Sequence, residues 1–278
     1  MDFIYSLMDM LPFEWVQYNF MKNALIGIIL ISPLLGLLGT MVVNNKMSFF
    51  SDALGHSALT GIAIGVLIGI DNYIVSMMGF AIVFALLISF VMESEVSSSD
   101  TIIGVFSSIG ISIGIVLLSF SGGFSKYSSY LIGDILSIKR SEIGLLFIVL
   151  ILVIAIWVVA FNKLLLSSIN SDLASSKQCN VKFFKNLFMI LIAIVVTVSI
   201  KWVGVLMINS LLILPAAASR NIAKNMKEYH IFSVLFSLIS GICGLFISFY
   251  LGLAAAGTIV IISAFIFFIT FFMNKTNK

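Results

Sequence analysis

Apolar stretches of membrane-spanning length follow one another along almost the whole chain of 278 residues. A helix needs about 20 apolar residues to cross roughly 30 Å of hydrocarbon. The residues are 61% hydrophobic and only 10% charged, which no water-soluble domain of this size matches. The sequence therefore predicts an all-α, polytopic membrane protein with about 8–9 transmembrane helices. Nine candidate spans are Ala24–Val43, Met47–Ile70, Ile74–Met92, Ile102–Phe120, Ile143–Phe161, Phe184–Ile200, Trp202–Ser219, Ile231–Leu251 and Leu253–Met273.

Three features leave the number of spans open. The sixth span is short and carries Lys185, neighbouring spans could merge at 200–202 or at 251–253, and Tyr127–Leu136 could add a half-helix. The polar segments between the spans are too short to fold as a soluble domain. We therefore expect residues 1–278 to form a single membrane domain.

The distribution of Lys and Arg predicts how the chain is oriented. With the amino terminus outside, the cytoplasmic loops carry 10 basic residues and the outer loops carry 5, as the positive-inside rule requires. Residues 1–20 mix apolar and acidic side chains, which is typical of an interfacial helix. Residues 165–182 form the longest cytoplasmic loop, and the capping residues that open Asn170–Lys177 predict a short helix there.

Several classes of function are excluded or disfavoured by what the sequence lacks. No glycine-rich loop ends in Lys-Ser or Lys-Thr, so any ATP that drives this protein must be hydrolysed by another chain. The net charge of +3 points to no nucleic-acid partner. Cys179 and Cys243 lie in very different settings, so free thiols are expected rather than a disulfide.

The second span contains Asp52 and His56, a carboxylate and one of only two histidines in the chain. A charge at the bilayer centre costs roughly 3 kcal/mol or more, so intramembrane ionisable residues usually mark a pathway. Residues four apart lie on one helix face with Cβ atoms about 6 Å apart. An oxygen and a nitrogen ligand so placed can share one divalent cation. Alternatively, the two side chains bind only each other or a neighbouring backbone group.

The same span has two stripes. Thr60 falls on the face of Asp52 and His56, and the opposite face carries glycines that allow close helix packing. If the helix starts at Met47, His56 lies about 13 Å along it, near the midplane. The polar stripe is therefore expected to line a route through the membrane. The glycines are Gly61, Gly65 and Gly69.

Three further polar residues have positions that suggest a role. Asn209 lies within the seventh span, a few residues before Pro215, and could be a further ligand, a gate hydrogen bond or an interhelical hydrogen bond. His230 follows a basic cytoplasmic segment and is expected to be a solvated loop histidine. Asp134, in the outer loop, is expected to cap a short helix.

The segment Phe49–Leu59, which reads FFSDALGHSAL, resembles the signature of the permease subunits of bacterial ABC importers for zinc, manganese and iron. Asp52 and His56 stand where family members carry an acidic residue and a histidine. The resemblance is collinear over about residues 24–270. The other similar segments are Ser98–Val105, Tyr130–Leu136, Asp172–Ala174, Val203–Leu206 and Leu214–Arg220.

This resemblance implies a fold like that of the cobalamin-type ABC importer permeases. It implies a homodimer in the bacterial cytoplasmic (plasma) membrane, with a central path for Mn²⁺, Zn²⁺ or Fe²⁺. Two ABC ATPase subunits would use ATP below, and an extracellular metal-binding lipoprotein would deliver cargo from above. This chain itself would be a transport subunit and not an enzyme, with no cofactor of its own.

The resemblance also implies roles for two loops. Asp172, Leu173 and Ala174 match the family's coupling-loop motif, and with Lys177 they would contact the ATPase. The sequence departs from the family at Lys177–Asn180, where a glycine is common in relatives. Lys139 and Arg140 break the positive-inside trend, and we hypothesise that they dock carboxylates of the delivery protein, the alternative being two exposed loop charges.

Three other classes of function stay open at this point. An ABC permease for a bulky metal chelate would have a wider path without the Asp52/His56 pair. An ion-coupled secondary metal transporter would use Asp52 as a proton site. An intramembrane hydrolase would use both residues in catalysis, but a nucleophile or a complete metal set on a second span is missing from the sequence.

Overall fold

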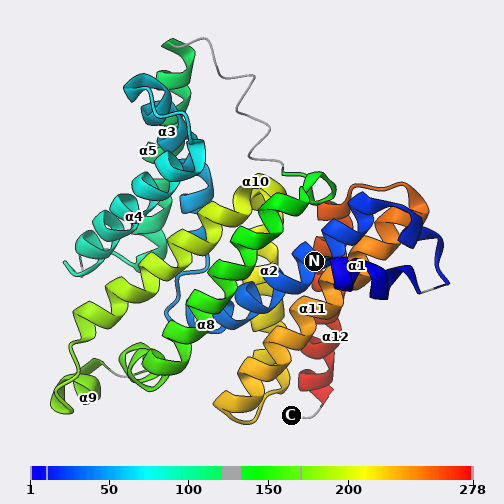
Figure 1. The fold of residues 1–278 in the computed structure, drawn as a ribbon. Coiled ribbons are helices and arrows are strands. Elements are labelled where there is room, and N and C mark those ends of the chain that lie inside the picture. The colour runs from blue at the N-terminus through cyan, green and yellow to red at the C-terminus, as the bar shows by residue number, and fades with distance from the viewer. Residues whose placement is uncertain (1, 11, 95, 121–132, 170, 277–278) are drawn as a thin grey trace.

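The computed structural model describes residues 2–10, 12–94, 96–120, 133–169 and 171–276. Every regular element in these residues is helical, which confirms the all-α prediction (Figure 1). The elements are α1 (Asp2–Asp9), η1 (Glu14–Gln17), α2 (Asn19–Asn44), α3 (Phe50–Ile68), α4 (Tyr73–Met92), α5 (Ser99–Phe120), η2 (Ile135–Ser137), α8 (Arg140–Ile169), α9 (Ser171–Ser176), α10 (Val181–Ile222), α11 (Met226–Leu251) and α12 (Ala255–Thr276).

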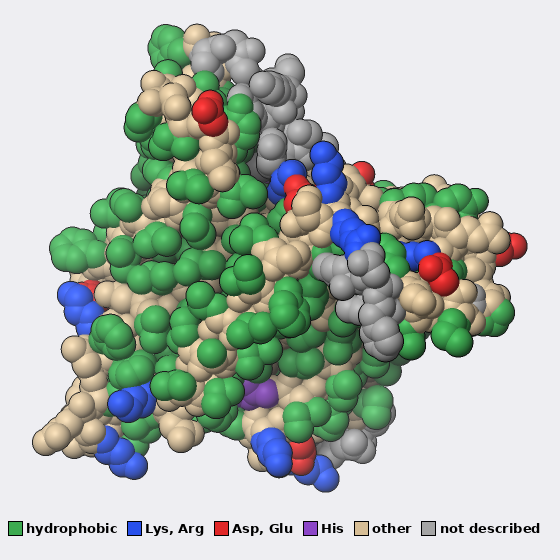
Figure 2. Space-filling model, viewed as in Figure 1, with side chains coloured by type: hydrophobic (Ala, Val, Ile, Leu, Met, Phe, Trp, Pro, Cys, Tyr) green, Lys and Arg blue, Asp and Glu red, His purple; other side chains and the backbone are tan. Residues whose placement is uncertain are grey.

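Eight of the described helices are long and apolar enough to cross a membrane. Figure 2 shows hydrophobic side chains over much of one face, with charged side chains mainly toward its right-hand side and along its left and lower edges. This distribution fits a molecule whose middle lies in hydrocarbon and whose ends meet water. The structure therefore agrees with a multi-pass membrane protein.

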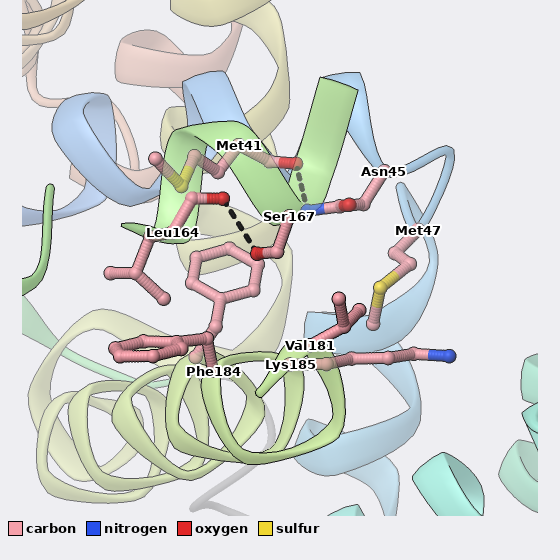
Figure 3. Close-up of a pocket in the computed structure, with 9 residues that line it drawn as sticks. Met41, Asn45, Met47, Leu164, Ser167, Val181, Phe184 and Lys185 are labelled. Atoms are coloured by element: carbon pink, nitrogen blue, oxygen red, sulfur yellow. Dashed lines mark hydrogen bonds between the residues drawn. The ribbon is translucent and has the colours of Figure 1, made fainter. Parts of the chain in front are cut away.

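The nine predicted spans occupy these eight helices because α10 doubles back. Its first residue, Val181, lines a pocket of about 40 Å³ together with Met41 near the carboxyl end of α2 (Figure 3). Just beyond its last turn, Tyr229 donates a hydrogen bond to Thr40 O at 3.3 Å. Both ends of α10 therefore lie beside the same end of α2. The two spans merge at 200–202, as considered from the sequence, and the reversal follows at Gly204, with φ 74° and ψ 161°.

Glycine is required in both of the segments that meet at this reversal. A positive φ of this kind is accessible to glycine and strained for other residues. A Cβ on Gly133, itself at φ +66°, would overlap the backbone of Gly204, so the two segments touch main chain to main chain. By contrast, the merger considered at 251–253 does not occur, because Gly252 ends α11 in the left-handed conformation.

Two boundary predictions need correction. Residues 1–20 do not form one helix: α1 and η1 are separate short helices, and Pro12 between them has no N–H to continue a helical ladder. Residues 165–182 are not mainly loop, because α8 runs to Ile169 and α10 starts at Val181, but the short helix expected at 170–177 is present as α9. Most of the half-helix considered at Tyr127–Leu136 lies outside the described residues.

Helix α2 is the most enclosed of the crossing helices together with α10. Small residues on α2 allow its neighbours to approach closely. A Cβ on Gly39 would overlap the carbonyl oxygen of Leu212 in α10, and one on Gly36 would come within 2.8 Å of Ser233 O in α11. The α3–α5 group packs beside this centre, at the upper left of Figure 1.

Candidate metal site on helix α3

Asp52 and His56 lie in the first two turns of α3. The helix starts at Phe50 and not at Met47, because Met47 N–H and Phe50 N–H are used in turns, to Val42 O and Met47 O, each at 3.0 Å. His56 is therefore about 9 Å along the helix at 1.5 Å per residue. The helix start considered at Met47, which would have put His56 about 13 Å along the helix, is wrong.

The two side chains face each other across one helical turn. His56 Nε2 lies 3.4 Å from Asp52 Oδ2, and the side chains keep 32% and 34% of their surface exposed. His56 Nδ1 is buried and has no hydrogen-bond partner among the described residues. The pair therefore has a nitrogen that lacks a hydrogen-bond partner and two side chains that are still one-third exposed. A purely structural hydrogen bond between the two side chains would explain neither.

Helix α10 fixes the other side of this turn. A Cβ on Gly55 would come within 2.6 Å of Val205 Cγ1, so the helices are in close contact immediately after the reversal at Gly204. Ser51 Oγ donates to Asn209 Oδ1 at 2.8 Å. Of the roles considered for Asn209, this geometry shows an interhelical hydrogen bond beside the pair.

Thr60 does not extend the polar stripe. It is buried, and its hydroxyl donates to Gly110 O of α5. The glycine stripe is confirmed at two of its three positions: Ser76 of α4 donates to Gly61 O, and a Cβ on Gly65 would overlap the Ser76 side chain. Gly69 instead ends α3 with φ 81° and has nothing within 4 Å of a Cβ position. The polar route is thus confined to the first two turns of α3.

No group of three or more His, Cys, Asp or Glu side chains that could hold a metal exists among the described residues. Asp52 and His56 supply two ligands, and a divalent transition metal usually takes four or more. The remaining positions would have to be filled by water, by backbone oxygens or by another chain. Such an incomplete set suits an ion in passage better than a permanently bound one.

The expected coupling residues lie on and just after α9. Ala174 is fully buried and Leu173 is 45% exposed, so this short helix presents one apolar side chain outward. Lys177 is exposed and follows the helix. Gln178 has φ 56°, a left-handed conformation that favours glycine, which gives a physical reason for the glycine common in relatives of this segment.

Lys139 and Arg140 are both exposed at the start of α8. Arg140 Cζ lies 5.0 Å from the centre of the Tyr5 ring, so α1 covers part of this basic surface. Asp134 Oδ1 accepts a hydrogen bond from Leu136 N–H at 3.0 Å, as expected for a cap.

His230 is the residue that sequence reasoning placed wrongly. It lies inside α11, is 8% exposed and packs against the rings of Trp157 and Phe161 of α8. Its Nδ1 lies 2.6 Å from Met226 O. The basic residues before it suggested a solvated loop, but α11 begins early enough to carry His230 into the helix contact.

These helices define a class: a multi-pass membrane protein that carries an ionisable pair on one of its crossing helices. The family model of the "ABC 3 transport family" matches residues 17–274, and the chain belongs to this family. It is accordingly a multi-pass permease subunit of the cytoplasmic membrane, a transport component and not an enzyme. This finding confirms the resemblance drawn from the sequence motifs.

Curated relatives cover nearly the whole chain. It is 30% identical to the manganese transport system membrane protein MntC of Listeria monocytogenes, over 92% of this chain and 91% of the relative. Identity is 31% to the manganese import system permease protein ScaB of Streptococcus gordonii, over 95% and 96%. It is 32% to the high-affinity zinc uptake system membrane protein ZnuB of Haemophilus influenzae, over 93% and 99%.

A solved structure has the same fold. PsaBC from Streptococcus pneumoniae in complex with Fab matches with a TM-score of 0.79 and 27% identity, over 98% of this chain and 95% of that chain. The match covers nearly the whole of both chains.

Proposed function

We propose that this chain is the permease subunit of an ATP-driven importer of Mn²⁺ or Zn²⁺, and that Asp52 and His56 bind the ion during passage. The observation that carries the proposal is the pair itself, with its ligand atoms 3.4 Å apart, its side chains one-third exposed and one imidazole nitrogen unpartnered among the described residues. Similarity to manganese and zinc uptake permeases supports the choice of ions.

The ligand types agree with this cargo. A carboxylate oxygen and an imidazole nitrogen suit Mn²⁺, Zn²⁺ and Fe²⁺, and the absence of thiolate from the pair avoids a trap too tight for release. Two ligands hold an ion weakly. A second copy of the chain would double the set to two carboxylates and two imidazoles, which is the support for a homodimer around a shared path.

The power and the cargo would come from other chains. A separate ABC ATPase would bind ATP and contact α9 through Asp172, Leu173, Ala174 and Lys177. The outward-facing Leu173 side chain offers that partner an apolar contact. An extracellular metal-binding lipoprotein would deliver the ion, with Lys139 and Arg140 offering positive charge to its carboxylates.

The test is metal uptake by cells that carry the whole transporter with Asp52→Ala or His56→Ala. We expect uptake of Mn²⁺ or Zn²⁺ to fall at least about tenfold while the complex still hydrolyses ATP. Thr60→Ser is the matched control on the same helix, because Thr60 bonds to Gly110 and lies off the route. Normal uptake in both alanine variants would refute the proposal, and uptake that persists with an inactive ATPase would favour a secondary transporter.

A further inference from the structure

Glu142, in the first turn of α8, gathers three hydrogen-bond donors on one carboxylate. Its Oε1 accepts from Lys201 Nζ, and its Oε2 accepts from Trp202 Nε1 at 2.9 Å and from Lys139 N–H at 3.0 Å. The Glu142 side chain is only 19% exposed. A largely buried carboxylate is stable in this setting because three donors form hydrogen bonds to it and one of them, Lys201 Nζ, carries a positive charge.

Two of the three donors, Lys201 and Trp202, lie shortly before the reversal of α10, and the third, Lys139 N–H, comes just before α8. Trp202 is fully buried and is the largest such side chain in the described structure. Lys201 Nζ also lies 5.8 Å from the centre of the Trp202 ring. Glu142 therefore holds the last turn of the first α10 segment, and Gly133 touches Gly204 at the reversal itself.

The residues immediately after the reversal reach the metal pair. Val205 packs on Gly55, and Asn209 accepts the hydrogen bond of Ser51, the residue before Asp52. A single non-helical residue, Gly204, separates the part of α10 held by Glu142 from the part that contacts α3. The hydrogen bond from Trp202 to Glu142 thus lies two residues before the point where the helix changes direction.

We infer that Glu142 is a positioning residue: through Lys201 and Trp202 it sets the angle of α10 at Gly204, and thereby the placement of α3 with Asp52 and His56. The inference rests on the proposed function only for its effect on metal binding. The positioning itself is a property of the helices and is measured without metal.

The direct test is a distance between α10 and α3. Leu206→Cys and Phe49→Cys place spin labels at positions that are 61% and 56% exposed, in a chain freed of its own thiols by Cys179→Ser and Cys243→Ser. We expect Glu142→Gln and Lys201→Met each to shift or broaden the distance distribution by about 2 Å, the scale of helix shifts at packed interfaces. The double variant should add nothing, because both changes break one contact.

The matched control is Glu93→Gln. Glu93 forms a 2.8 Å ion pair with Lys182, which lies at the opposite end of the same α10 segment. This variant should leave the distance distribution unchanged. An unchanged distribution in Glu142→Gln and Lys201→Met, or an equal shift in Glu93→Gln, would overturn the inference.

A second measurement tests whether the angle of α10 affects metal binding at Asp52 and His56. Equilibrium Mn²⁺ binding to the purified permease, followed by paramagnetic resonance, should weaken about tenfold in Glu142→Gln and stay at the wild-type value in Glu93→Gln. Asp52→Ala reports on the proposed function separately. If Asp52→Ala binds Mn²⁺ like wild type, the metal site is refuted while the distance result still decides the role of Glu142.

Discussion

The α2–α11 contact and the α3–α10 contact both depend on small residues, yet their polar side chains are used differently. Across α2–α11, Ser233 donates to Gly36 O at 2.6 Å and Ser237 donates to Ser32 O at 2.8 Å, and both serines are fully buried. Across α3–α10, Ser51 donates to the side chain of Asn209 at 2.8 Å, and the neighbouring pair is left one-third exposed. The hydroxyls that hold helices together find a partner on the facing helix, whereas the side chains that could bind cargo stay partly exposed.

The largest expected effect tests the first contact. Gly36→Ala would place a Cβ 2.8 Å from Ser233 O and 3.0 Å from Val234 Cα, and neither backbone can move away without separating α2 from α11. We expect loss of folded protein, measured as the monodisperse fraction in size-exclusion chromatography. Gly79→Ala, where a Cβ meets nothing within 4 Å, is the control and should fold normally. A well-folded Gly36→Ala protein would show that the α2–α11 contact does not depend on a small residue.

The second prediction tests the metal pair with variants that preserve shape. Asp52→Asn and His56→Gln should lower uptake of Mn²⁺ or Zn²⁺ at least about tenfold, because each removes a strong ligand. The melting temperature should stay near that of the parent protein, since neither side chain closes a helix contact. A thermal melt of the purified permease beside the uptake assay checks both parts. A large loss of stability with normal uptake would show that the pair is structural.

A smaller effect sharpens the role of the serines. Ser233→Ala and Ser237→Ala should each cost about 0.6 kcal/mol, the mean value for interhelical hydrogen bonds in membranes. Ser210→Ala is the control, because Ser210 Oγ donates to Leu206 O of its own helix and therefore does not link two helices. Unfolding in mixed micelles gives the free energies. Equal costs for Ser210→Ala and Ser237→Ala would contradict the assignment.

The smallest expected effect lies outside both helix contacts and gives a reference for the size of the other stability changes. Gln178→Gly should stabilise the protein by about 0.5 kcal/mol, because glycine relieves the left-handed strain at φ 56° but loses more chain entropy on folding. The same micelle unfolding assay measures it. Gln178→Ala keeps the strain and should give no gain, so stabilisation by alanine would point to another cause.

The fold class and the candidate pair could be predicted from the sequence because each depends on local information. Hydrophobic length reports spans directly, and a four-residue spacing reports a shared helix face without knowledge of the neighbours. The pair Asp52 and His56 is therefore visible in the sequence, and the structure places it as the spacing requires.

What could not be predicted depends on contacts between distant segments. The reversal at Gly204 depends on Gly133 and, through Trp202, on Glu142, and both of these residues are more than 60 positions before Gly204 in the chain. A glycine within an apolar run does not by itself predict a turn. The burial of His230 depends on Trp157 and Phe161 of α8. Thr60 does not extend the polar stripe because its hydroxyl donates to the carbonyl of Gly110 in α5.

The reversal of α10 also decides to which compartment each end of the chain belongs. Asn221, at the end of α10, donates to Thr270 of α12 at 3.2 Å, so the last helix finishes at the carboxyl end of α2, whereas α1 is tied to its amino end through Lys22 and Asp9. The two ends of the described chain therefore lie at opposite ends of α2. We expect a reporter fused to one terminus to face a different compartment from a reporter fused to the other.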